Sequence, residues 1–306
     1  MADVLAAEAA TAENSHSIFV TAPDGLKLHV RSYGSPTARG LPVVCLAGMA
    51  RTTVDFDALA AALSSDTAQP RRVIALDYRG RGLSEYDRDF KKYSLSIECT
   101  DVSAVVTALG LAPAVFVGTS LGGLLTMMLA AHRPTAIAGV VLNDIGPVVE
   151  PKGLMRIRGY LGKLPQPRTY DEGAEILRRL FDAQFPKLDV DDWRAYAKRT
   201  WKDQRGRLVP DYDVKLAKTL DDVDLERPQP ARWNEFDALG RTPLMVIRGA
   251  NSDLLSPATV SAMQARRPDM DVVEVPDQGH APLLEEPGLL RRIASFIAFC
   301  EISAHR

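Results

Sequence analysis

The segment around residue 120 reads Ala114-Val115-Phe116-Val117-Gly118-Thr119-Ser120-Leu121-Gly122-Gly123. An apolar run typical of a buried strand ends at Val117, and an apolar helical run from Leu124 to Ala131 follows almost at once. The glycines two positions before and after Ser120 allow a strand and a helix to pack closely, because they carry no Cβ atom. This pattern predicts a nucleophile elbow, which would present the Ser120 hydroxyl at a helix N-terminus.

Composition places the 306-residue chain among ordinary globular proteins, with 46% apolar and 25% charged residues. The length suits one α/β domain that carries an insertion. The formal net charge of -2 offers nucleic acid no general attraction, and no apolar stretch approaches the roughly 20 residues of a membrane span. We therefore expect neither nucleic acid nor a membrane as a partner. Residues 1–16 lack the basic start and apolar core of a secretion signal, and we expect them to form a disordered tail.

The three cysteines are Cys45, Cys99 and Cys300, and they form no C-x-x-C pair. No histidine lies at metal-ligand spacing from them. We expect three buried free thiols, a cytoplasmic location and no metal site.

Apolar runs without alternation are separated by helical patterns along most of the chain, which predicts a mostly parallel central sheet with helices on both faces. After an opening hairpin, the buried strand runs are 41–46, 72–76, 114–117, 139–144, 243–249 and 272–275. The alternation breaks between residues 146 and 232, where only helical stretches are evident. We interpret 146–232 as an inserted helical cap that divides the core domain into 17–145 and 233–306. The cap aromatics that we expect to line an apolar substrate pocket are Phe181, Trp193, Tyr196 and Trp201.

A serine hydroxyl needs a base to remove its proton, and the base needs a third group to fix its tautomer. Of the five histidines, His280 alone lies in a loop after a late strand, which favours it as the base. Asp253 follows the strand before that loop and gives the chain order serine, aspartate, histidine. Asp144, at the end of an earlier strand, is the competing acid. We favour Asp253, because the length of its loop and the chain order both suit it.

Four segments together carry a resemblance: Leu46-Ala47-Gly48-Met49, the turn from Asp77 to Ser84, the elbow at Ser120, and the late loops. In these the chain resembles the α/β-hydrolase superfamily, in its serine carboxylesterase-like branch with a helical cap. The resemblance implies an oxyanion hole made of the backbone N–H groups of Met49 and Leu121. Family members commonly have His-Gly where this chain has Ala47-Gly48. Dehalogenases and epoxide hydrolases of this fold have aspartate at the elbow, so Ser120 speaks against both. We interpret Arg79 and Arg81 as charges that fix their own loop.

The predicted function is hydrolysis of small to medium hydrophobic carboxylic esters through an acyl-enzyme intermediate on Ser120. The mechanism needs no cofactor and no metal. The open alternatives are a C–C bond hydrolase, acting on a β-diketone or a ring-fission product, and a lactonase, both using the same three residues. A non-catalytic ligand receptor with this fold is a further alternative. The partner is then a small-molecule ester, and the protein is expected to be a monomer or a homodimer.

Overall fold

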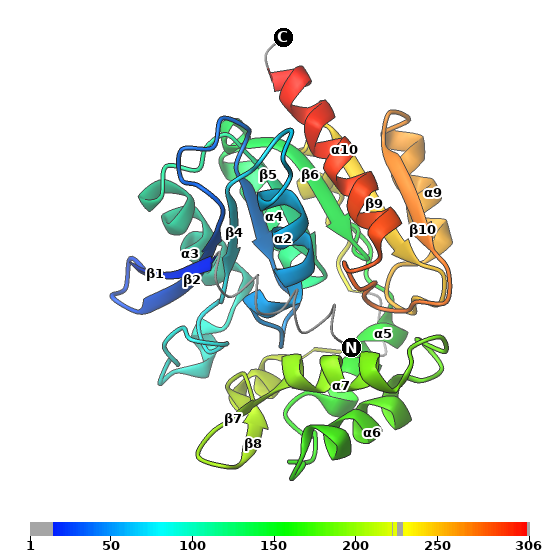
Figure 1. Ribbon diagram of the computed structural model, residues 1–306. Helices are drawn as coiled ribbons and strands as arrows, with labels where there is room; N and C mark the ends of the chain where they lie inside the picture. Colours follow the sequence, from blue (N-terminus) through cyan, green and yellow to red (C-terminus); the bar gives the residue numbers. More distant parts are fainter. Residues whose placement is uncertain (1–14, 222, 225–228, 305–306) are drawn as a thin grey trace.

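The computed structural model describes residues 15–221, 223–224 and 229–304, and its main sheet has eight strands (Figure 1). Strand β2 pairs antiparallel with β1 and β4, and all other neighbouring strands are parallel. The predicted mostly parallel sheet is therefore confirmed. In spatial order the strands are β1 (Ser15–Thr21), β2 (Lys27–Tyr33), β4 (Val73–Leu76), β3 (Val43–Leu46), β5 (Ala114–Thr119), β6 (Ile137–Asn143), β9 (Leu244–Gly249) and β10 (Asp271–Val275).

The predicted tail extends two residues too far, since β1 begins at Ser15 and pairs that residue with Tyr33. His16 is likewise part of the strand, opposite Ser32. Residues 1–14 of the expected tail lie outside the described residues.

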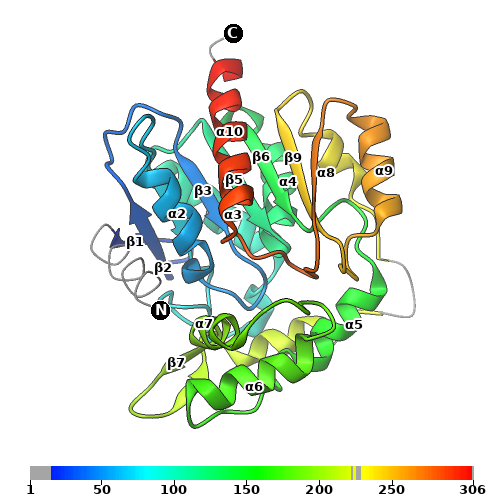
Figure 2. The same ribbon diagram turned by 45° about the vertical axis from the view of Figure 1, so that its right-hand side comes forward.

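Helices cover both faces of the sheet (Figures 1 and 2). Helices α2 (Asp57–Ser64) and α10 (Pro287–Ala304) pack on one face through residues such as Leu59 and Ile293. The other face carries α3 (Leu95–Ala108), α4 (Leu121–His132), α8 (Trp233–Asp237) and α9 (Pro257–Arg266). Short 3-10 helices occur at η1 (Thr53–Phe56), η2 (Phe90–Lys92) and η3 (Pro134–Ala136). Because both faces are covered, every residue of β3 and β4 is buried, which explains their unbroken apolar runs.

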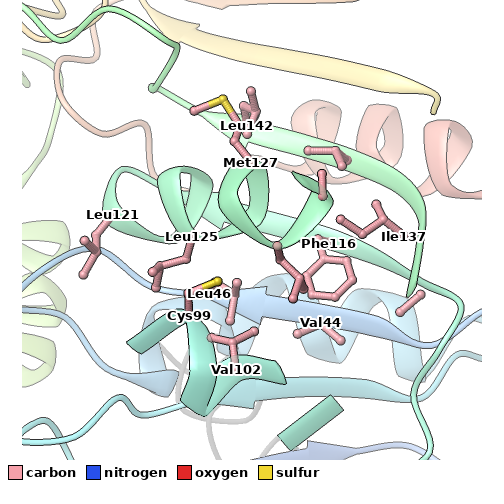
Figure 3. Packing of buried hydrophobic residues seen from close by; sticks show 14 of the residues in the cluster. Val44, Leu46, Cys99, Val102, Phe116, Leu121, Leu125, Met127, Ile137 and Leu142 are labelled. Carbon is pink, nitrogen blue, oxygen red and sulfur yellow. The ribbon is translucent and has the colours of Figure 1, made fainter. Parts of the chain in front are cut away.

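Helix α4, which follows Ser120, lies at the centre of this packing. Figure 3 shows Leu125 of α4 beside Cys99 and Val102 of α3, with Leu46 of β3 close by. Its side chains are apolar on almost every face, as expected of a helix enclosed by the sheet and by other helices. The rigid surroundings fix the position of the turn at the helix N-terminus.

Residues 151–220, between β6 and α8, form a separate layer, shown below the sheet in Figures 1 and 2. Its elements are α5 (Pro151–Tyr160), α6 (Tyr170–Phe181), α7 (Val190–Thr200), β7 (Trp201–Asp203), β8 (Leu208–Pro210) and η4 (Val214–Leu220). Thr169 caps α6, and Asp189 and Asp192 form a capping box at the start of α7. We call residues 151–220 the insert. The two-stranded β7–β8 hairpin was not predicted, because three-residue strands are too short to show a period.

The register of the sheet brings the ends of four strands to one edge. Leu46 of β3 lies opposite Gly118 of β5, and Thr119 of β5 lies opposite Asn143 of β6. Asn143 in turn lies opposite Ile247 of β9. The loops that follow these strands therefore begin side by side, at the edge where sites form in sheets of this kind.

Candidate active site

The turn at Ser120 has the geometry expected of a nucleophile elbow. Ser120 has φ 52° and ψ −114°, a strained conformation for a residue with a side chain. A Cβ atom on Gly122 would lie 2.0 Å from the carbonyl oxygen of Leu46, and one on Gly118 would lie 2.6 Å from the carbonyl carbon of Gly122. Both glycines are thus required for strand β5 and helix α4 to approach each other and for Ser120 to sit at the helix N-terminus.

Three side chains from distant parts of the chain form a hydrogen-bonded series at this turn. The Ser120 Oγ atom lies 2.9 Å from Nε2 of His280, and Nδ1 of His280 lies 2.8 Å from Oδ2 of Asp144. The Asp144 side chain is 0% exposed and that of His280 is 6% exposed. Asp144 also accepts the Gly249 N–H at 2.9 Å and the Ser252 hydroxyl at 2.5 Å. These bonds hold its carboxylate against the imidazole, which is the arrangement that a serine nucleophile requires.

The structure contradicts Asp253 as the acid partner of His280. Asp253 instead accepts two hydrogen bonds from Arg156 of α5, at 2.7 and 2.9 Å. Burial raises the pKa of Asp253, but the Arg156 guanidinium and a hydrogen bond from Gln184 outweigh it and lower the pKa below 3.8. The reason lies in the sheet order: Asp144 directly follows β6, the neighbour of β5, whereas Asp253 lies four residues beyond the end of β9.

The loop of Ala47 to Arg51 lies beside Ser120 and is held by its carbonyl groups. The Ala47 carbonyl accepts the Gly122 N–H and the Tyr78 hydroxyl, both at 3.1 Å. The Met49 carbonyl accepts Nε of Arg81 at 2.8 Å. Met49 lines the cavity at Ser120, and Leu121 is the first residue of α4. The Arg51 N–H donates to the Gly48 carbonyl at 3.2 Å, whereas the Met49 N–H has no acceptor among the described residues and is left to bind a ligand oxygen.

Arg79 and Arg81 fix the loop from Asp77 to Ser84 to its surroundings, which confirms their predicted role. Both are buried, Arg79 in a two-bond pair with Asp101 and Arg81 in an ion pair with Glu98. Neither lines the cavity at Ser120. Arg81 nevertheless influences that cavity, because its bond to Met49 fixes the position of the neighbouring loop.

A cavity of about 110 Å³ opens beside Ser120 and His280. Of the predicted pocket residues, Phe181 and Tyr196 line it, with Leu161 and Leu177 among the apolar side chains next to them. The prediction for the other two aromatics, Trp193 and Trp201, is wrong. Both are buried within the insert, where they belong to the apolar cluster that α6 and α7 share.

The cavity also holds charged residues that sequence reasoning missed. They are Arg51 and Asp55 from the core and Arg199 and Glu285 from two separate segments. Two signals could have revealed the arginines. Arg51 lies two residues after Met49, at the end of the same loop. Arg199 lies three residues after Tyr196, which places Tyr196 and Arg199 on one face of α7.

A second serine, histidine and aspartate set occurs elsewhere in the fold. Ser17 Oγ lies 2.8 Å from Nε2 of His29, and Nδ1 of His29 lies 2.7 Å from Asp77. Here the serine belongs to the regular strand β1 and not to a strained turn such as the one at Ser120. The Asp77 carboxylate also accepts the N–H groups of Thr53 and Leu83, so this set fixes a turn. Three hydrogen-bonded side chains therefore do not by themselves make a catalytic site.

Within residues 15–221, 223–224 and 229–304, no group of three or more His, Cys, Asp or Glu side chains could hold a metal ion. In the same described residues, every helix is too short or too polar to cross a lipid bilayer.

Comparisons with known proteins show the family of the chain. Residues 43–293 match the sequence profile described as the alpha/beta hydrolase family. The chain is 33% identical over 274 residues to the 3-hydroxybutyrate-oligomer hydrolase of Cupriavidus necator, covering 87% of this chain and 91% of that one. It is 26% identical over 278 residues to the 2-(acetamidomethylene)succinate hydrolase of Mesorhizobium japonicum, covering 89% and 92%. A solved alpha/beta hydrolase from Novosphingobium aromaticivorans is similar at 40% identity and a TM-score of 0.84, with 93% and 98% covered.

Proposed function

We propose that this chain, which belongs to the alpha/beta hydrolase family, is a serine hydrolase that cleaves small carboxylic esters through an acyl-enzyme intermediate. The observation that carries the proposal is the series of hydrogen bonds from Ser120 through His280 to Asp144, at the wall of a cavity. Ser120 is the proposed nucleophile, His280 the base, and Asp144 the group that fixes the imidazole tautomer.

The reaction follows from the positions of these atoms. Ser120 Oγ attacks the ester carbonyl carbon while its proton moves to Nε2 of His280. The negative charge then develops on the former carbonyl oxygen, where the N–H groups of Met49 and Leu121 are the proposed donors. Collapse of this intermediate breaks the bond to the alcohol, which takes the proton from His280. A water molecule activated by the same imidazole then releases the acid and restores Ser120.

The insert supports a limit on the size of the substrate. We infer that residues 146–232 act as a cap domain, whose Phe181 and Tyr196 would contact the substrate beside Ser120. A cavity of about 110 Å³ with apolar side chains in its lining suits a short acyl or alcohol group. The relative from Cupriavidus necator is named for 3-hydroxybutyrate oligomers. We therefore propose two kinds of substrate, simple hydrophobic esters and short oligoesters of hydroxy acids.

The proposal is tested by an ester panel that varies acyl length, read as kcat/KM, with Ser120→Ala as the inactive variant. We expect kcat/KM to be highest for short acyl chains and to be lost in Ser120→Ala. A panel with no ester turnover, together with cleavage of a β-diketone, would favour the C–C hydrolase alternative. Turnover of lactones in preference to open-chain esters would favour a lactonase. If none of the compounds is cleaved, the result would favour a ligand receptor.

The cellular setting is proposed on separate grounds. The three cysteines are free and buried, as expected in a reducing compartment, and we propose a cytoplasmic location. A small molecule is the proposed partner, and the chain is proposed to act as a monomer or a homodimer. Light scattering of the purified protein would measure the number of chains.

A further inference from the structure

One wall of the cavity at Ser120 is charged, although cleavage of a purely hydrophobic ester needs no charge there. Arg51, Asp55, Arg199 and Glu285 contribute to this wall, and Thr200 lies between them. Removing charged side chains from water is costly unless each gains a partner. The partners of the two arginines therefore indicate what the wall is built to hold.

Each of the three nitrogens of the Arg51 guanidinium donates a hydrogen bond to a group of the protein. Its Nε and Nη2 atoms donate to the two oxygens of Asp55, at 2.7 and 2.5 Å. Its Nη1 atom donates to Oγ1 of Thr200 at 3.0 Å. The guanidinium lies 4.8 Å from the centre of the Tyr196 ring. Arg51 is thus held rigidly, close to the loop that flanks Ser120.

Arg199 is less completely engaged. It forms an ion pair with Glu285, and its guanidinium lies 5.7 Å from the centre of the same Tyr196 ring. Its Nε atom is buried and has no hydrogen-bond acceptor among the described residues. Burial lowers the pKa of Arg199, and the like charge of Arg51 adds to this, against the opposing effect of Asp55. Because Arg199 lines the cavity, this unpaired N–H leaves a place for one more acceptor.

We propose that Arg199, supported by Arg51, binds a free carboxylate of the substrate while Ser120 attacks its ester bond. The substrate class is then an ester that carries a carboxylate, such as the acid end of a hydroxy-acid oligomer or a monoester of a diacid. Arginine has five N–H donors in a fork, so Arg199 can hold a ligand carboxylate and keep Glu285. The Glu285 side chain is 35% exposed against 16% for Arg199, which leaves it free to shift toward solvent. This inference rests on the proposed ester hydrolase function.

The test compares two substrates that differ only in charge. One is the 3-hydroxybutyrate dimer, and the other is the same dimer with its terminal carboxylate converted into a carboxamide. We expect kcat/KM of the wild-type enzyme to be about 10-fold higher for the acid than for the amide, mainly because KM is lower. This is the gain in binding that one hydrogen-bonded charge pair provides. In Arg199→Met the ratio of the two kcat/KM values should fall toward one, and in Arg199→Lys it should lie between these limits.

Two further variants make the test decisive. Arg194→Met removes an exposed arginine of the same helix, paired with Asp171 and Asp191, and should keep the wild-type ratio. Glu285→Gln removes the competing carboxylate and should lower KM for the acid, and it serves if Arg199→Met fails to fold. A wild-type ratio near one, or a ratio unchanged in Arg199→Met, would overturn the inference. Absence of cleavage of both dimers and of every simple ester would instead refute the proposed function.

Discussion

The identity of the acid that faces His280 leads to the sharpest prediction, made with the variant Asp144→Asn. The Asp144 Oδ1 atom accepts the Gly249 N–H, which can only donate, so the asparagine oxygen should remain at that position. The amide NH₂ would then occupy the place of Oδ2, 2.8 Å from Nδ1 of His280. An NH₂ group there favours the tautomer with its proton on Nε2. That tautomer cannot accept the proton of Ser120.

The expected loss follows from comparable changes of tautomer, which reduce kcat by about 10⁴-fold. This corresponds to about 5 kcal/mol of transition-state stabilisation at about 1.4 kcal/mol for each tenfold change. The matched control is Asp253→Asn, which removes the same charge from a partly buried aspartate bound to Arg156. We expect Asp253→Asn to change kcat by less than about 3-fold, because its carboxylate does not contact the imidazole.

The assay is the steady-state hydrolysis of p-nitrophenyl butyrate, with the thermal unfolding of each variant measured in parallel. Unfolding data are needed because Asp144 also holds Gly249 and Ser252 in place. The reasoning would be refuted if folded Asp144→Asn kept more than about a tenth of the wild-type kcat. A larger loss in Asp253→Asn than in Asp144→Asn would refute it equally.

Two further predictions concern stability. Gly122→Ala should destabilise the fold by about 3 kcal/mol or prevent folding, because its Cβ atom would meet the Leu46 carbonyl. The control is Gly159→Ala, at a helical position where a Cβ atom would have nothing within 4 Å. Chemical denaturation should show that this control is neutral or stabilising. Asp253→Asn should lower the free energy of unfolding by about 1–3 kcal/mol at pH 7. Folding lowers the pKa of Asp253 from 3.8, so its stabilisation is fully present above pH 3.8 and is lost as the pH falls through the lowered pKa. Wild type and variant should therefore converge in acid. A constant difference down to pH 2 would contradict this.

Much of the sheet could be predicted because its signals are local. The strands β3, β4 and β5 are buried on both faces, and they appear in the sequence as short, unbroken apolar runs. The elbow could also be predicted, because the close approach of Gly122 to Leu46 requires a glycine there, and this glycine is visible in the sequence. Ser120 could be chosen because it lies at the centre of the elbow pattern, and His280 because it is the histidine that follows a late strand.

The acid could not be chosen correctly, because the choice depends on which strands are neighbours. Asp144 and Asp253 both follow predicted strands, and the sequence alone does not reveal that β6 lies next to β5. The partner of Asp253, Arg156, lies on a helix of the insert whose position no local pattern indicated. Loop length and chain order were therefore insufficient criteria.

The cavity lining was only half predictable for a similar reason. Aromatic residues on α6, α7 and β7 are needed both for the core of the insert and for the cavity wall. Trp193 and Trp201 serve the core, whereas Phe181 and Tyr196 reach the cavity. The role of each depends on how the insert sits on the strand ends, which is a property of the whole fold. The charged wall of Arg51 and Arg199 was missed because its members come from both layers.

The central claim is that Ser120, and not another serine, becomes covalently modified during the reaction. The most direct measurement is mass spectrometry of the protein after treatment with a fluorophosphonate, followed by mapping of the modified peptide. We expect one adduct on Ser120, lost in Ser120→Ala, strongly slowed in His280→Ala and retained in Ser17→Ala. Modification of Ser17, or the absence of any adduct on the folded wild-type protein, would contradict the account.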